Sequence, residues 1–332
     1  MSLTAEAILA IPVTAPFRLF PKDAKERHDQ FKVLAKIWHP DVDGGRPEVF
    51  SHISALYDAA ENPQPTAHLE IVSREGKKYN LQYRKMHRFE LGSMAIGHNV
   101  VAFIIDKTHE DLVLSGLRSI GSVRYPDNRM KEQHSRFVPF VERVVETDTQ
   151  HVIIIKKTPD VVLLRDLITH LGVLDPKHVA WIVSSLLNLN CFYEISGFCH
   201  NGLSVDTVFV SPQHHAAFPL GGWWYALNVG KTLKYLPPSS HAIAPRDVLR
   251  TKKADHRIDL ESVRAIARTC LGDSAGGTLV TSLPKPLSSF LRLPAPKRPI
   301  KDYEAWEKVL VDSYGQRRFL KLPVDPASDI YV

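Results

Sequence analysis

The segment 21–60 most narrows what this chain can fold into. Four apolar residues recur at the i, i+3, i+4, i+7 spacing of one helix face, while most basic residues occupy the other faces: Phe31, Leu34, Ala35 and Trp38. Pro40 ends this helix at His39, because proline disfavours helical geometry in the residue before it. A second amphipathic helix is predicted over 47–60, with proline in its first turn. We therefore expect two helices that pack along a shared apolar seam.

The tripeptide His39-Pro40-Asp41 directly follows the first helix, and a glycine-rich turn comes next. In this order, residues 1–65 resemble a J-domain, the co-chaperone module that stimulates the ATPase of a DnaK-type (heat-shock seventy) chaperone. The resemblance implies that His39, Pro40 and Asp41 stimulate the partner's ATP hydrolysis, with proline stiffening the loop. It also implies that basic residues dock against an acidic partner surface, namely Lys25, Arg27, Lys32 and Lys36.

The short first helix of the family is poorly represented in this chain. It is reduced to Phe17-Arg18-Leu19-Phe20, and residues 1–12 suggest no role. We therefore expect an abbreviated module. The alternative interpretation is a helical hairpin that kept this fold and lost the partner.

Residues 66–158 carry strand signals, and residues 159–332 carry mainly helical ones. Strands are predicted in a hairpin around 74–77 and over 99–105, 112–117, 140–146 and 151–156. Helices are predicted within 127–137 and over 161–171, 176–195, 259–271, 284–293 and 302–314. This order is typical of an α+β fold with two lobes. We expect a helical module over 1–65, a linker at Asn62-Pro63-Gln64-Pro65, a β-rich lobe over 66–158 and an α-rich lobe over 159–332.

The order of several motifs between about residues 85 and 318 resembles a protein kinase domain. Gly92 and Gly97 have the spacing of the outer glycines of the glycine-rich loop. His200 and Leu203 match two positions of the His-Arg-Asp-Leu catalytic loop. The later matches are Pro219-Leu220-Gly221-Gly222 at the Asp-Phe-Gly position, Ala244-Pro245-Arg246 at Ala-Pro-Glu, Asp259 at the next large helix, and Arg298-Pro299. Another two-lobed α+β family could also produce these matches.

The groups that perform phosphoryl transfer in kinases are missing at these positions. Gly202 replaces the catalytic Asp, Thr207 replaces a metal-binding Asn, and Gly222 ends a motif that lacks its Asp. The strand expected to carry the phosphate-binding Lys, 112–117, has none, so Glu132 would lack its partner. Arg298 would face Arg246 in place of the usual Glu.

Because catalysis in kinases depends on Mg²⁺, Lys and a carboxylate, the resemblance implies a pseudokinase. No catalytic residue, metal site or cofactor is expected. The same missing groups argue against the binding of ATP with Mg²⁺.

The charge and cysteine content limit the other functional classes. The chain has 332 residues, a net charge of +6 and a pI of about 9.1, so a nucleic-acid partner is not excluded. Its 3 cysteines lack metal-ligand spacing, and their odd number argues against a disulfide framework, so a reducing compartment is the default expectation. The N-terminus lacks a signal-peptide pattern, and the apolar runs are too short to span a bilayer. We expect a cytoplasmic protein with no membrane partner.

An intact His39-Pro40-Asp41 beside a body without catalytic groups favours a co-chaperone or adaptor. In this interpretation the J-domain-like module engages a DnaK-type chaperone, and the kinase-like body binds an unknown client protein. The alternative is an atypical kinase-fold enzyme that transfers phosphate or nucleotide, with a metal held by Glu132, Asp206 or Asp255. A scaffold that uses both parts only for interactions is a third possibility.

Overall fold

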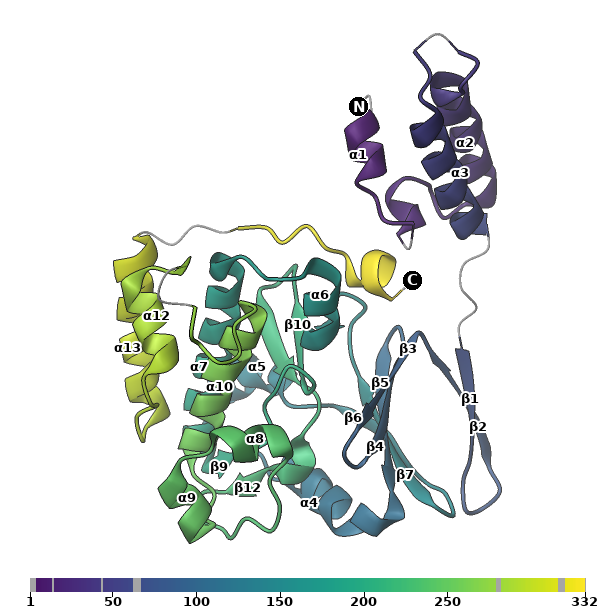
Figure 1. Cartoon of the computed structure of the whole chain (residues 1–332). Helices are drawn as coiled ribbons and strands as arrows, with labels where there is room; N and C mark the ends of the chain where they lie inside the picture. The colour runs from purple at the N-terminus through teal and green to yellow at the C-terminus, as the bar shows by residue number, and fades with distance from the viewer. Residues whose placement is uncertain are drawn as a thin grey trace.

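The computed structural model describes residues 4–13, 15–42, 44–61, 67–278, 282–315 and 320–331. Figure 1 shows a small helical module at the N-terminal end and a larger body, in which a β-rich lobe lies beside a helical lobe. The β-rich part precedes the helical part, as predicted. The predicted linker at 62–65 lies outside the described residues.

The N-terminal module consists of α1 (Ala5–Leu9), the 3-10 turn η1 (Pro16–Arg18), α2 (Ala24–Trp38) and α3 (Pro47–Glu61). Asp23 caps α2 by accepting hydrogen bonds from the backbone N–H groups of Lys25 and Glu26, at 3.0 Å each. Phe31 and Tyr57 stack with ring centroids 4.2 Å apart, in a core that all three helices share. The predicted helical hairpin is therefore present.

The module is not abbreviated in the way the sequence suggested. Residues Ala5–Leu9 form a helix that packs against α3 and buries Ala5 and Ile8. Residues 17 and 18, which we had expected to be the remnant of this helix, belong to the turn η1. A helix of one and a half turns shows too little periodicity to be recognised in the sequence.

The β-rich lobe is a five-stranded antiparallel sheet in the order β3-β4-β5-β7-β6. Its strands are β3 (Lys85–Phe89), β4 (Gly92–Ile96), β5 (Val100–Asp106), β6 (Val141–Glu146) and β7 (Gln150–Lys156). In β5, Phe103 joins the main core, while Ala102 and Ile104 join a second core on the opposite face. The predicted hairpin of β1 (Ala67–Val72) and β2 (Lys78–Tyr83) covers that second face. Because both faces are covered, β5 is a continuous apolar run.

The segment 112–117, which we predicted to be a strand, is part of helix α4 (Glu110–Gly121). Val113 and Gly116 lie on its buried side, and Gly116 lies against the backbone of Trp224. Periodicity cannot distinguish a helix from a strand in so short an apolar stretch. The turn η2 (Lys107–His109) precedes α4, and α5 (Asn128–His134) with the turn η3 (Ser135–Phe137) confirms the helix predicted within 127–137.

The helical lobe is built around α7 (Pro176–Ser196), on which α10 (His256–Cys270) and α13 (Pro299–Tyr314) pack. Its other elements are β8 (Val162–Leu163), α6 (Leu164–Leu171), β9 (Phe198–Cys199), β10 (Val208–Ser211), β11 (Ala216–Pro219), the turn η4 (Trp223–Tyr225), β12 (Leu227–Asn228), α8 (Pro238–Ile243), α9 (Arg246–Thr251) and α12 (Lys285–Arg292). The predicted helices of this lobe are present within a few residues of their expected bounds. In the part of the chain that the structure describes, none of the helices is long and apolar enough to cross a membrane.

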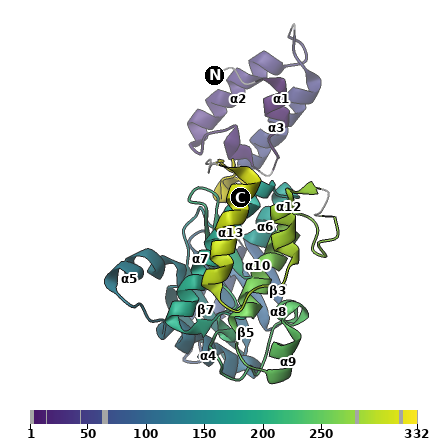
Figure 2. The same cartoon turned by 90° about the vertical axis from the view of Figure 1, so that its left-hand side faces the viewer.

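After α13 the chain returns as a C-terminal tail, residues 320–331, which includes the π-helical turn η5 (Pro326–Ile330). Leu322, Val324 and Tyr331 of the tail are buried in the main core. Figure 2 shows the C-terminal end of the chain between the N-terminal module and the body.

Candidate functional site

His39, Pro40 and Asp41 lie between α2 and α3, at the end of the hairpin that points away from the body (Figure 1). The Nδ1 atom of His39 accepts a hydrogen bond from the backbone N–H of Asp41 at 3.3 Å and lies 3.5 Å from an Asp41 carboxylate oxygen. The His39 ring stands edge-on to Phe50, with centroids 4.9 Å apart. The side chain of His39 is 42 % exposed and that of Asp41 87 %. The loop therefore orients the imidazole and leaves the carboxylate in solvent.

Gly45, from the predicted glycine-rich turn, and Arg46, which the sequence did not single out, fix the shape of this loop. A Cβ atom at Gly45 would lie 1.9 Å from the carbonyl oxygen of His39, so glycine alone allows this close approach. Arg46 donates hydrogen bonds to Glu48 at 2.7 Å and to Glu6 of α1 at 3.2 Å. These contacts tie the loop to both neighbouring helices.

The exposed face of α2 combines positive charge with apolar surface. The predicted docking residues Lys25, Lys32 and Lys36 are all exposed. Val33 and Ile37, which lie next to two of these lysines in the sequence, are 58 % and 52 % exposed. Such a surface suits a partner with acidic and apolar groups.

Arg27 does not belong to this surface, so its prediction as a docking residue is wrong. It is 8 % exposed, and its Nε donates a hydrogen bond to Glu61 at the end of α3, at 2.8 Å. Its Nη1 donates to the backbone carbonyl of Lys22, also at 2.8 Å. Arg27 is therefore an internal link of the module.

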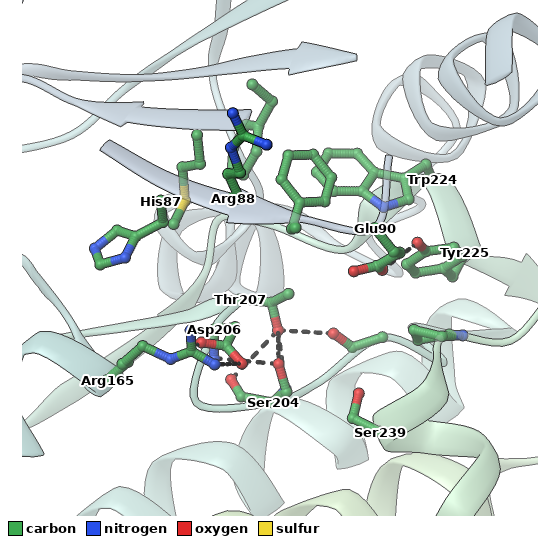
Figure 3. Close-up of a pocket in the computed structure, with 15 residues that line it drawn as sticks. His87, Arg88, Glu90, Arg165, Ser204, Asp206, Thr207, Trp224, Tyr225 and Ser239 are labelled. Atoms are coloured by element: carbon green, nitrogen blue, oxygen red, sulfur yellow. Dashed lines mark hydrogen bonds and ion pairs between the residues drawn. The ribbon is translucent and has the colours of Figure 1, made fainter. Parts of the chain in front are cut away.

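A cleft of about 180 Å³ opens between the two lobes of the body (Figure 3). The β-rich lobe lines it with residues 87–90 and with Met94 and Phe103, and the helical lobe lines it with Arg165, the loop 202–207 and residues 224–225. Ligand pockets typically measure about 300–1,000 Å³. The cleft as it stands is therefore small for a drug-sized ligand.

The loop 200–207, which was matched to the kinase catalytic loop, is held by backbone contacts. His200 and Asn201 are fully buried, and their N–H groups donate to the two carboxylate oxygens of Asp259, at 2.7 Å each. Burial lowers the pKa of His200 to about 3 and raises the pKa of Asp259 to about 7. These contacts therefore fix the loop to α10, and none of the three side chains lines the cleft.

Three positions where kinase chemistry needs acidic or amide groups hold other residues. Gly202 has no side chain, and the Thr207 hydroxyl donates to the Gly202 carbonyl at 2.7 Å. Leu220, two residues before Gly222, is buried in the main core. Among the described residues there is no group of three or more His, Cys, Asp or Glu that could hold a metal ion. Phosphate-bound Mg²⁺ would find no carboxylate at these three positions.

Asp206 is the one carboxylate of the loop 200–207, and Arg165 of α6 neutralises it. The Nε and Nη2 atoms of Arg165 pair with the two carboxylate oxygens, as Figure 3 shows. Burial raises the pKa of Asp206 even though Arg165 opposes this effect. The carboxylate is therefore already paired with a cation of the same chain, at a position that solvent reaches.

Gly92 and Gly97 do not form one glycine-rich loop, contrary to the prediction. Gly92 begins β4, whereas the N–H of Gly97 bonds to Val100 in the turn after β4. The turn that borders the cleft is formed by Glu90 and Leu91, between β3 and β4. The Tyr225 hydroxyl donates to Glu90 there, which ties the turn to the segment after Gly222 (Figure 3).

β5 pairs with β4 on the side opposite β3, contains no lysine, and brings Phe103 to the cleft. The prediction that residues 112–117 form this strand is wrong, because they belong to α4. Glu132 is exposed on α5, which stands out from the side of the body in Figure 2. It is therefore not a glutamate of the cleft.

Arg298 pairs with a residue of α7 and not with position 246, where arginine stands in place of the usual glutamate. Its Nε donates to Glu194 of α7 at 2.8 Å. Pro245, in the Ala-Pro-Glu-like motif, stands immediately before α9 as its N-cap residue. Both predicted positions therefore have structural roles in the helical lobe.

The sequence analysis missed a buried carboxylate at the lobe junction, Asp166 of α6. It binds Lys85 and His87 of β3 at 2.7 and 3.1 Å, and it accepts a hydrogen bond from the Tyr331 hydroxyl at 2.8 Å. Burial alone would raise the pKa of Asp166, but the bonds from His87 and Lys85 outweigh this and lower it. No local pattern could indicate the cluster, because His87 and Tyr331 are 79 and 165 residues away along the chain.

A five-stranded sheet, a helical lobe around α7, and a cleft closed by the loop 200–207 together define a protein-kinase-like fold. A solved structure of vaccinia related kinase 3 matches this chain with a TM-score of 0.50 and 14 % sequence identity, over 75 % of this chain and 92 % of that one. At this identity the match establishes the fold alone. No protein-family model and no curated protein sequence matches the chain.

Proposed function

We propose that this protein is a co-chaperone or adaptor. In this proposal the N-terminal module acts as a J-domain on a DnaK-type chaperone, and the kinase-like body is a pseudokinase that binds a client protein. The observation that carries the proposal is the presentation of His39-Pro40-Asp41 to solvent at the free end of a helical hairpin.

The exposed side of α2 supports this assignment. Lys32 and Lys36 would steer an acidic chaperone surface, and the exposed Ile37 would add apolar contact close to the tripeptide. The imidazole of His39 is already oriented by its contacts with Asp41 and Phe50, and the carboxylate of Asp41 is exposed. Both groups would then bind the partner with little loss of conformational freedom.

The cleft supports a binding role for the body rather than phosphate transfer. Gly202, Thr207 and Leu220 supply no metal-binding carboxylate, and β5 carries no lysine and lines the cleft with Phe103. The residues of the enzymatic alternative are exposed or already engaged: Glu132 is exposed on α5, Asp206 pairs with Arg165, and Asp255 caps α10 and pairs with Arg257. We therefore expect no Mg²⁺-dependent rise in Tm with ATP, whereas a ligand that binds only the folded state would raise it.

The direct test is single-turnover ATP hydrolysis by a bacterial DnaK-type chaperone. The wild-type protein should stimulate hydrolysis, and His39→Gln and Asp41→Asn should abolish the stimulation. Asp312→Asn, on the exposed face of α13, is the matched control and should stimulate like the wild type. Equal rates with the wild type and both loop variants, from folded proteins, would refute the J-domain assignment.

A further inference from the structure

The C-terminal tail contacts the N-terminal module through Arg18, which forms an ion pair and a hydrogen bond with it. Arg18 of η1 donates from Nε to Asp329 at 2.6 Å, and its Nη2 pairs with the second carboxylate oxygen. The same Nη2 donates to the carbonyl of Pro323 at 3.0 Å. Asp329 is buried and also accepts the backbone N–H of Asp325 at 2.9 Å. The guanidinium of the module is therefore held by a preformed acceptor site in the tail.

Two residues further on, the tail enters the junction between the two lobes of the body. The ring of Tyr331 is buried, and its hydroxyl accepts the N–H of Leu163 at 3.0 Å while donating to Asp166 at 2.8 Å. The Lys157 ammonium lies over the ring, 5.6 Å from the centroid. These contacts fix the tail end to the segment that connects the lobes.

The Asp166 carboxylate also holds the β-rich lobe. Lys85 and His87, both on β3, reach it from the other side of the junction. One carboxylate therefore joins β3, α6 and the tail, and the tail joins that carboxylate to Arg18. The physical connection from the module to the lobe junction is continuous.

We propose that the tail is a clasp that fixes the orientation of the N-terminal module and makes it depend on the relative position of the two lobes. A partner that moves β3 away from α6 breaks the cluster at Asp166 and loosens Tyr331. The neighbouring Asp329 then loses its fixed geometry, and Arg18 is released. The inference uses these contacts alone and does not depend on the activity proposed for the module.

The first test measures the shape of the full chain by small-angle X-ray scattering. Arg18→Glu and Asp329→Arg should each increase the maximum dimension and the radius of gyration, because the module is released. Arg74→Glu, in an exposed ion pair on the β1–β2 hairpin, is the control and should leave both values unchanged. Wild-type scattering from a folded Arg18→Glu variant would overturn the clasp.

The second test asks whether the lobe junction and the module are coupled. Tyr331→Phe removes the hydroxyl from Asp166 and Leu163 and keeps the buried ring. Amide hydrogen exchange should become about 5- to 25-fold faster in the tail, in β3 and in η1, because two hydrogen bonds are lost and the net loss of each corresponds to about fivefold. Faster exchange confined to the tail would refute the coupling while leaving the Arg18 contact intact.

Discussion

Two loops of this molecule each carry a histidine that the sequence singled out, but they differ in solvent exposure. In the module, Asp41 is exposed and makes one contact, with the His39 ring. In the body, His200 and Asn201 are fully buried, and Asp259 holds their backbone. The first loop leaves the Asp41 carboxylate in solvent, while the second buries both its histidine and its asparagine.

The difference shows which loop can act on another molecule. A polar group that already satisfies buried backbone N–H groups cannot be released without cost, because those groups would lose their partners. An exposed carboxylate contributes little to the fold and keeps its hydrogen-bonding capacity for a partner. Of these two loops, the hairpin loop of the module is therefore the one whose polar groups can contact a partner as proposed.

The largest expected effect is on stability. Asp259→Ala leaves two buried N–H groups unpaired, and at about 1–3 kcal/mol for each group we expect a loss of about 2–6 kcal/mol in the free energy of unfolding. Asp41→Ala, at an exposed position, should change it by less than about 0.5 kcal/mol. Urea denaturation of both variants measures the contrast, and similar losses would show that the two loops do not differ as described.

The buried imidazole of the second loop should make stability depend on pH. Burial lowers the pKa of folded His200 to about 3. Between about pH 6.5 and 3, the imidazole is therefore protonated in the unfolded chain and neutral in the folded chain. This contribution to stability is present above pH 6.5 and is lost as the pH falls toward 3, by at most about 1.4 kcal/mol per pH unit.

Asp259 has the opposite effect on stability over part of this range. Because its pKa is raised to about 7 in the folded state, its protonation makes the folded state more stable as the pH falls from about 7 to 3.8. The unfolding free energies of the wild type and His200→Gln should therefore be compared at each pH, so that the contribution of Asp259 cancels. We expect the difference to move in favour of the variant on acidification below pH 6.5. A constant difference between pH 6.5 and 4 would contradict the buried, neutral imidazole.

The shape of the first loop depends on Gly45, and Gly45→Ala should distort it. The added Cβ would meet the His39 carbonyl at 1.9 Å, so the backbone must shift, at a cost of about 1–3 kcal/mol. Stimulation of the chaperone ATPase should fall together with the Tm. Gly121→Ala is the control, because an added Cβ there meets nothing within 4 Å. Full stimulation by Gly45→Ala would show that the loop geometry is not required.

The elements that depend on local pattern could be predicted from the sequence. The spacing of Phe31, Leu34 and Trp38 and the stop at Pro40 gave α2 and the hairpin, and α7 is long enough for its period to be clear. Residues 112–117 were misassigned because six residues fit a helix or a strand. The neutral residues Gly202 and Thr207 could be identified from the sequence, because the loop matched to the kinase catalytic loop is one continuous segment.

Contacts between distant segments could not be predicted. Arg27 looked like one more surface cation, but its partner Glu61 lies 34 residues away on α3. Gly92 and Gly97 have a spacing that fits a loop as well as the two ends of a strand. The bonds of Tyr225 to Glu90 and of Tyr331 to Asp166 depend on the tertiary fold alone.

The smallest expected effect concerns the exposed lysines of α2 and the rate at which the protein associates with the chaperone. Lys32→Gln should slow association with the chaperone a few-fold at low salt, because an exposed charge at an interface mainly changes the association rate. The effect should shrink at high ionic strength, where the Debye length falls from about 10 Å at 0.1 M to about 3 Å at 1 M. Lys297→Gln, an exposed position of the body with the same change in net charge, is the control and should leave the rate unchanged. Equal slowing by both variants would mean that the net charge of the chain, and not the face of α2, steers the encounter.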